Sequence, residues 1–186
     1  TIHKLELPFF VLATQNPLEQ EGTYPLPAAQ QDRFIFTIFV DYPELDEENE
    51  IVRRVSEQNF GQINEVCAGE ELIELQRVLR AIPVADAVID YANALVRATR
   101  LGTDAVSQHA TDWLSVGAGP RATINLVTAS RCFCALDGRV APSCDDVARA
   151  ALPVLRHRLG LNYVARAEGL TTDDVIKKLV ADVPKY

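Results

Sequence analysis

Methionine is absent from this chain of 186 residues, and cysteine and histidine are scarce. The four cysteines are Cys67, Cys132, Cys134 and Cys144, and no two of them form a Cys-x-x-Cys pair. Together with three histidines they give no spacing typical of a zinc site, and they are too few for a disulfide scaffold. We therefore expect no metal site and cysteines that are reduced and packed.

An excess of positive charge is also missing. The chain has 18 Lys plus Arg against 26 Asp plus Glu, a net charge of -8 and a pI near 4.9. Nucleic-acid binding is therefore not expected, since it requires a basic surface. No apolar run approaches the roughly 18 residues of a membrane span. Glu6 interrupts the apolar start, so we expect no signal peptide. The expected reduced cysteines favour a cytoplasmic protein.

The chain lacks the motif that holds nucleotide phosphates in P-loop proteins. Its lysines are Lys4, Lys177, Lys178 and Lys185, and none follows a glycine, so there is no Gly-Lys-Ser/Thr. A Walker B site needs an apolar strand that ends in an acid, whereas AVIDY at 87–91 lies in a helical pattern. No magnesium ligands are expected within this chain.

Two apolar runs and a long helical body predict the fold. Pro8–Thr14 and Phe34–Val40 resemble strands that are buried on both faces. After Pro43 the apolar spacing is helical. The expected helices lie at 44–58, 70–82, 84–101, 120–136, 143 to about 160, and 171 to about 180. The predicted class is mainly α, with two strands within residues 1–42 and a helical domain over 43–186.

The segment GAGPRA at 117–122 is the strongest candidate for an anion site. Pro120 is placed to begin a helix, and Arg121 falls in its first turn, where the helix dipole is positive. A bound anion would offset that repulsion, and so would a nearby carboxylate, or the side chain faces solvent. The match to a Gly-x-Gly-x-x-Ala dinucleotide motif is weak, because helices are expected on both sides.

Two further residues are candidates. Asn16 follows the first apolar run, where a sheet's carboxyl edge binds ligands, although an Asn before Pro17 is also typical of a turn. Arg33 precedes the second run, where it could reach a neighbouring molecule's phosphate or pair with Asp32 or Glu21.

In combination these segments resemble the MoxR-type AAA+ ATPases. The stretch FFVLATQNPLEQEGTYPLPAAQQDRF at 9–34 is similar to the family's hallmark, and VRATR, GAGPRA, ALDGR and LRHRL follow in the family's order. The resemblance covers nearly the whole chain but only the C-terminal part of such an ATPase. We therefore expect a partial chain, consistent with its first residue being Thr, with Walker A and B upstream.

The resemblance implies a role for each candidate. Asn16 is similar to sensor 1, which orients the attacking water, and Arg33 to the arginine finger, which points at a neighbouring subunit's nucleotide. Arg121 is similar to sensor 2, with Gly119 and Pro120 beside it at the nucleotide. The resemblance further implies ATP and Mg as cofactors of the full-length protein and a homo-oligomer, expected to be a hexameric ring.

The chain departs from the family pattern at a few positions. Ala28 replaces the usual glutamate, Gln31 a leucine, and Gly119 a serine. Ala28 leaves open how the family's interface carboxylate is replaced. The expected function is ATP hydrolysis in a chaperone-like ring, in assembly or metal-cofactor insertion, with this chain alone inactive. The alternative is a non-enzymatic helical adaptor derived from an AAA+ lid.

Overall fold

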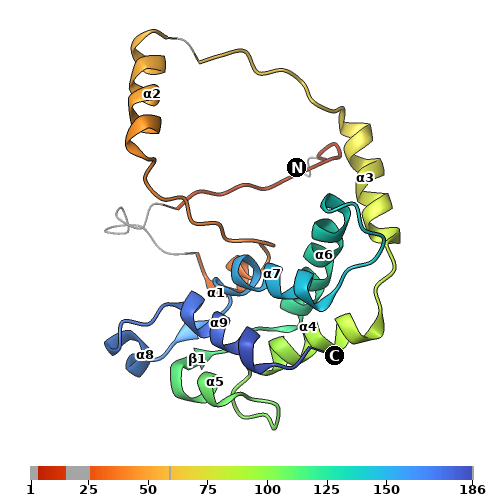
Figure 1. Ribbon diagram of the computed structural model, residues 1–186, viewed down its shortest axis with the longest axis vertical. Coiled ribbons are helices and arrows are strands. Elements are labelled where there is room, and N and C mark those ends of the chain that lie inside the picture. Colours follow the sequence, from red (N-terminus) through yellow and green to blue (C-terminus); the bar gives the residue numbers. More distant parts are fainter. Residues whose placement is uncertain (1–3, 16–25, 59, 186) are drawn as a thin grey trace.

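The computed structural model describes residues 4–15, 26–58 and 60–185. Within these ranges the chain is mainly helical, which confirms the predicted class. Asn16, the sensor 1 candidate, lies outside the described residues. Figure 1 shows a packed body below and two helices, α2 (Leu45–Ser56) and α3 (Gly69–Ala81), that stand apart from each other above it.

The packed body is built from helices in the second half of the chain. Its long helices are α4 (Asp86–Arg97), α6 (Pro120–Leu136), α7 (Cys144–Leu155) and α9 (Thr172–Asp182). Helix α6 packs against α7 and α4, and α9 packs against α7. All six helices expected from the sequence are present, although α4 and α7 are shorter than expected.

Several short elements were not predicted. They are α1 (Ala28–Gln31), α5 (Gln108–Trp113), α8 (Tyr163–Ala167) and the strands β1 (Leu114–Val116) and β2 (Gly160–Leu161). The two strands pair antiparallel, with Leu114 opposite Leu161. Elements this short carry too little periodicity to be recognised in a sequence.

Capping boxes begin two of the long helices, and both have the expected residue spacing in the sequence, Ser143 with Asp146 and Thr171 with Asp174. Asp146 Oδ2 accepts from the Ser143 backbone N–H at 2.7 Å, and Asp174 Oδ2 accepts from that of Thr171 at 2.9 Å. These contacts satisfy backbone donors that lie outside the helical hydrogen-bond ladder. They fix where α7 and α9 start.

The hydrophobic core joins α4, α6, α7 and α9. Its largest fully buried apolar side chains come from all four helices and are Tyr91, Leu95, Leu126, Leu155, Ile176 and Leu179. Removing such side chains from water is the main favourable contribution to folding, about 1.5–3 kcal/mol for each large aliphatic residue. The stability of the body therefore resides in the chain from α4 onward.

The structure corrects the expectation of strands at Pro8–Thr14 and Phe34–Val40. Neither segment is a strand or a helix, and Leu12 and Val40 are 95% and 91% exposed. A strand needs a neighbouring strand to satisfy its backbone N–H and C=O groups. The described part of the chain places none beside these segments.

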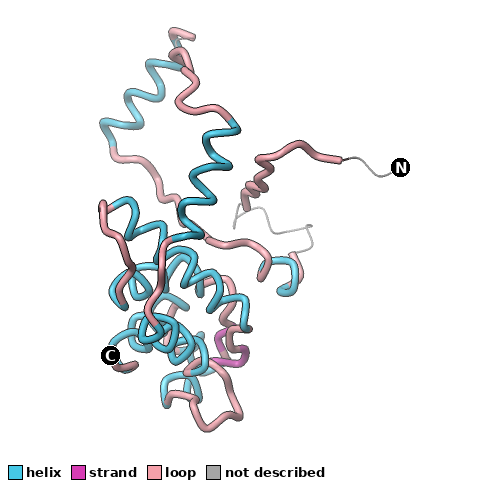
Figure 2. Tube along the Cα trace, turned by 90° about the vertical axis from the view of Figure 1, so that its right-hand side faces the viewer, coloured by secondary structure: helices cyan, strands magenta, loops and turns pink. Residues whose placement is uncertain are grey.

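The cysteines differ in burial, so not all of them are packed as the sequence predicts. Cys134 is buried as expected, whereas Cys67 is exposed because it lies in the linker between α2 and α3. Figure 2 shows the part of this linker at 60–68 as loop, away from the packed body. None of the helices in the described ranges has the length and hydropathy needed to cross a membrane.

Candidate functional site: an arginine cluster at the start of α6

The loop before α6 is held tightly against the end of α4. The hydroxyl of Thr99, a fully buried side chain, accepts a hydrogen bond from the Ala118 N–H at 2.9 Å. Arg100 Nε donates to the Ala118 carbonyl at 3.0 Å. A Cβ added to Gly117 would lie 2.1 Å from the Thr99 carbonyl oxygen, so only glycine fits there. The VRATR segment therefore positions the GAGPRA segment.

The first turn of α6 has the properties of an anion-binding helix start. Gly119 is the N-cap and offers no side-chain acceptor, Pro120 is the first helical residue, and the turn contains no acidic side chain. A Cβ on Gly119 would meet nothing within 4 Å, so the backbone there is open. Pro120 has no N–H, and the Ala122 N–H donates to the Gly119 carbonyl at 3.1 Å, so it is the positive end of the helix dipole that favours an anion here.

The dinucleotide interpretation of this segment finds no support in the structure. A short strand, β1, does precede α6, where a helix was expected from the sequence. However, β1 pairs antiparallel with β2 in a two-stranded sheet. A dinucleotide-binding unit needs parallel strands joined through the helix.

Arg121 pairs with a carboxylate that is distant in the sequence. Its Nη1 lies 2.7 Å from Asp32 Oδ2, and its side chain is 49% exposed. Arg121 thus pairs with a carboxylate, although not with one close to it in the chain. The partner comes from the turn after α1, 89 residues away, so the contact joins the N-terminal segment to the helical body.

A second arginine, which the sequence pattern did not single out, reaches the same carboxylate. Arg158 Nε donates to Asp32 Oδ1 at 2.9 Å, and its side chain is 1% exposed. Its other donors meet backbone carbonyls, those of Asp32 at 2.8 Å, Phe34 at 2.5 Å, Ile35 at 3.3 Å and Val154. Burial lowers the pKa of the Arg158 guanidinium, and Asp32 opposes that decrease.

The end of α7 supplies the rest of the contact surface. Arg156 donates to the Thr37 carbonyl at 3.1 Å and pairs with Asp173 at 2.7 Å, and the Thr37 N–H donates to the Pro153 carbonyl at 2.9 Å. The last carbonyls of a helix attract donors and cations. The N-terminal segment therefore docks on the C-terminal end of α7.

His157 lies between Arg156 and Arg158 in the chain and is neutral at pH 7. Its Nε2 donates to the Phe34 carbonyl at 3.2 Å, since a carbonyl oxygen can only accept. Its Nδ1 is buried and has no partner among the described residues. Burial, followed by the charge of Arg158, lowers the pKa of His157 to about 4.

The three predicted catalytic residues are placed differently. Asn16 is outside the described ranges. Arg33 follows Asp32 directly, its side chain is exposed, and no described residue pairs with that side chain. Arg121 therefore contacts Asp32 through an ion pair, and Arg33 is the residue that follows Asp32 in the chain. Among the described residues no group of His, Cys, Asp and Glu is arranged to hold a metal.

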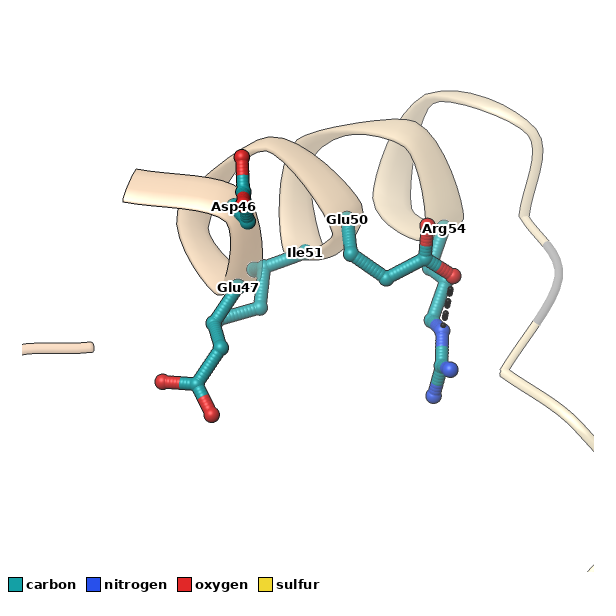
Figure 3. Close-up of a pocket in the computed structure, with 5 residues that line it drawn as sticks. All are labelled: Asp46, Glu47, Glu50, Ile51 and Arg54. Carbon is teal, nitrogen blue, oxygen red and sulfur yellow. Dashed lines mark hydrogen bonds and ion pairs between the residues drawn. The ribbon is translucent and has the colours of Figure 1, made fainter. Parts of the chain in front are cut away.

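A shallow hollow on α2 does not compete with the arginine cluster as a site. Figure 3 shows its lining, Asp46, Glu47, Glu50, Ile51 and Arg54, which all come from one helix. The Glu50–Arg54 pair, at 2.9 Å, spans one turn of that helix. No second element among the described residues contributes a side chain to this hollow.

Two family models match separate parts of the chain. One, described as the AAA lid domain, matches residues 107–179, which hold α6, α7 and most of α9. The other, described as ATPase family associated with various cellular activities, matches residues 1–36. Each model therefore covers one side of the Asp32 contact.

Relatives over nearly the full chain decide the family. Chaperone MoxR1 of Mycobacterium tuberculosis is 38% identical over 176 residues, 95% of this chain and 46% of that protein. The chain belongs to the MoxR family of AAA+ ATPases. Protein YeaC of Bacillus subtilis is 34% identical over 97% of the chain and 55% of its own length. This MoxR-family chain thus spans about half the length of the curated relatives it matches.

A solved structure has the same fold. The crystal structure of a Cytophaga hutchinsonii protein described as a candidate ATPase superposes with a TM-score of 0.89 at 35% identity. The match covers 99% of this chain and 56% of that protein. At this identity the likeness supports an AAA+ ATPase arrangement for the MoxR-family chain, including its helical lid.

The sequence held a signal for the missed residue. LRHRL at 155–159 places two arginines in the last turn of the helix that is expected to end near 160, where cations bind the final carbonyls. The partner could not be inferred in the same way, because Asp32 lies 126 residues earlier.

Proposed function

We propose that this MoxR-family chain serves an ATPase that binds and hydrolyses ATP with Mg in an oligomeric ring. The observation that carries the proposal is the unbalanced charge at the start of α6. One carboxylate, that of Asp32, faces both Arg158 and Arg121 and is followed in the chain by Arg33. Positive charge is therefore in excess there, in a chain whose net charge is -8. A phosphate group is the anion that such a cluster suits.

The proposed roles follow from the family. Arg121 acts as sensor 2, with the open backbone at Gly119 and Pro120 beside the γ-phosphate. Arg33 acts as the arginine finger towards a neighbouring subunit, and Asn16 as sensor 1. Phosphoryl transfer depends mainly on such fixed charges and on positioning. A finger supplied in trans makes a ring, here proposed as a hexamer, necessary for turnover.

The proposal also includes the domain boundaries, the role of the ring in the cell and the inactivity of this chain by itself. Residues 1–42 end the α/β core, and 43–186 form the lid domain. The ring acts as a cytoplasmic chaperone in the assembly of protein complexes or the insertion of metal cofactors. Because the sequence has no Gly-Lys-Ser/Thr, this chain alone holds neither the β-phosphate nor Mg and is expected not to turn over ATP.

A titration with a fluorescent ATP analogue tests the proposal on the purified chain. One charge-assisted contact and a helix start support a Kd of about 1 mM, equivalent to about -4 kcal/mol. We expect Arg121→Ala to weaken binding about fivefold or more. The control Arg149→Ala removes an arginine that pairs with Asp137 and lies over the Phe133 ring, and it should leave binding unchanged.

Two results would contradict the proposal. Equal binding by the chain and by Arg121→Ala would remove the start of α6 as a phosphate site and would favour the adaptor alternative. That alternative is supported by the exposed apolar side chains of 9–12 and 35–40. Magnesium-dependent turnover by the purified chain would show that the missing phosphate-binding motif is not needed.

A further inference from the structure

The Asp32 carboxylate is shared by two arginines that differ in their surroundings. Its Oδ1 meets Arg158 at 2.9 Å and its Oδ2 meets Arg121 at 2.7 Å. Arg158 is buried and has further acceptors on the backbone, whereas Arg121 is half-exposed and Asp32 is its side-chain partner among the described residues. The contact with Arg121 is therefore the one that a solute anion can replace.

The same carboxylate belongs to the turn that carries Arg33. Arg158 binds the carbonyls on both sides of Arg33, that of Asp32 at 2.8 Å and that of Phe34 at 2.5 Å. Further along the chain, the Thr37 N–H binds α7 through the Pro153 carbonyl. The position of Arg33 thus depends on how firmly this turn is docked on the lid.

Asp32 also occupies the place that an external anion would take. It presents two carboxylate oxygens to arginine guanidinium groups beside the first turn of α6. Carboxylate and phosphate bind arginine through the same geometry. Asp32 uses Nη1 of Arg121, and two negative groups beside one guanidinium repel each other, so a phosphate and Asp32 compete for Arg121.

We propose that Asp32 is a positioning residue that couples the start of α6 negatively to the Arg33 turn. A phosphate group bound by Arg121 displaces the Asp32 contact and thereby weakens the docking of the Arg33 turn on the lid. Coupling between two binding equilibria is reciprocal, so undocking of the turn strengthens phosphate binding by the same factor. This inference rests on the proposed phosphate site at Arg121.

The size of the coupling follows from the contact that is exchanged. A half-exposed ion pair is a weak interaction, and losing it corresponds to a factor of up to about five. We expect an effect of about two- to fivefold on both equilibria. The buried Arg158 contacts keep the turn from being released completely.

Binding of inorganic tripolyphosphate to the purified chain is the first measurement. Asp32→Asn should bind about two- to fivefold more tightly than the unchanged chain, and Arg121→Ala should lose binding. Asp137→Asn is the matched control, because Asp137 is likewise shared by two arginines, Arg139 and Arg149, but contacts neither Arg121 nor the Arg33 turn. Its affinity should equal that of the unchanged chain.

Tryptic cleavage after Arg33 is the second measurement and needs no substitution at Asp32. A protease must draw out the backbone that Arg158 holds, so docking slows cleavage. Saturating tripolyphosphate should accelerate cleavage after Arg33 about two- to fivefold relative to cleavage after Arg77, which lies on the exposed face of α3. Arg121→Ala should abolish this acceleration.

The outcomes separate the inference from the proposed function. Binding that depends on Arg121, with no gain in Asp32→Asn and no change in cleavage, would overturn the coupling and leave the phosphate site intact. Failure of every variant to bind tripolyphosphate would overturn both. If Asp32→Asn does not fold, the cleavage ratio in the unchanged chain and in Arg121→Ala decides the matter.

Discussion

Helices α2 and α4 are both amphipathic, but the apolar face of α4 is buried whereas that of α2 is exposed. The apolar stripe of α4 is buried in the core and consists of Val88, Tyr91, Ala92, Leu95 and Val96. The stripe of α2 is exposed along its length and contains Leu45, Ile51, Val52 and Val55. The comparison shows that an amphipathic pattern specifies a helix but not its burial, because burial needs an opposing apolar surface.

The same contrast holds for the two halves of the described chain. The part from α4 onward forms a closed core, whereas α2 and α3 contain no buried residue. The segments at 4–15 and 26–42 contact the body through limited sites, of which the Asp32 turn is the best defined.

The largest effect is expected from truncating the core. Leu126→Ala in α6 should lower the free energy of unfolding by about 2–5 kcal/mol, because it removes a fully buried side chain and leaves a cavity. Val52→Ala in α2, which is 63% exposed, should cost less than about 0.5 kcal/mol. Urea denaturation followed by circular dichroism measures both. Equal costs would show that α2 is buried in solution.

A pair of glycines sharpens the contrast within the site itself. Gly117→Ala should destabilise the chain by about 1–3 kcal/mol, because its Cβ would lie 2.1 Å from the Thr99 carbonyl oxygen. Gly119→Ala meets nothing within 4 Å and should cost no more than about 1 kcal/mol, because alanine is a poorer N-cap than glycine. Thermal unfolding of the two variants provides the test. Similar melting temperatures would contradict the tight packing of this loop.

A smaller, pH-dependent effect is expected from His157. Its pKa is about 4 in the folded chain and near 6.5 when unfolded, so the unfolded chain binds more protons between these values. The contribution of neutral His157 to the free energy of unfolding is therefore complete above pH 6.5, the pKa in the unfolded chain. It is lost as the pH falls towards about 4, the pKa in the folded chain. His157→Gln should reduce this loss by about 1–2 kcal/mol.

Urea titrations at pH 7 and at about pH 4.5 measure the effect of His157. His109→Gln is the control, because His109 belongs to α5, pairs with Asp182 at 2.9 Å and takes no part in the docking contacts of α7. The control should retain the full loss of stability on acidification. An unchanged pH dependence in His157→Gln would show that the ring is solvated, and hence that the N-terminal segment does not dock on α7.

The sequence predicted the long helices because their apolar spacing and capping residues are local. The boundaries of α6 at Pro120 and Leu136 agree with the prediction, and the Ser143–Asp146 capping box begins α7. Strands at 8–14 and 34–40 were not observed because a strand depends on partners that local sequence does not provide. The short elements lacked enough periodicity to be predicted.

Only the part of the candidate site that is formed by neighbouring residues in the chain was predicted. The helix start with Arg121 was recognised because glycine, proline and arginine follow one another in the chain. Arg158 was not, since its role depends on Asp32, Phe34 and Ile35, which lie more than 120 residues away. The sequence determined which segments become helices and which residues carry charge. The tertiary structure alone decided that Asp32 lies between Arg121 and Arg158, because that arrangement arises from packing between distant segments.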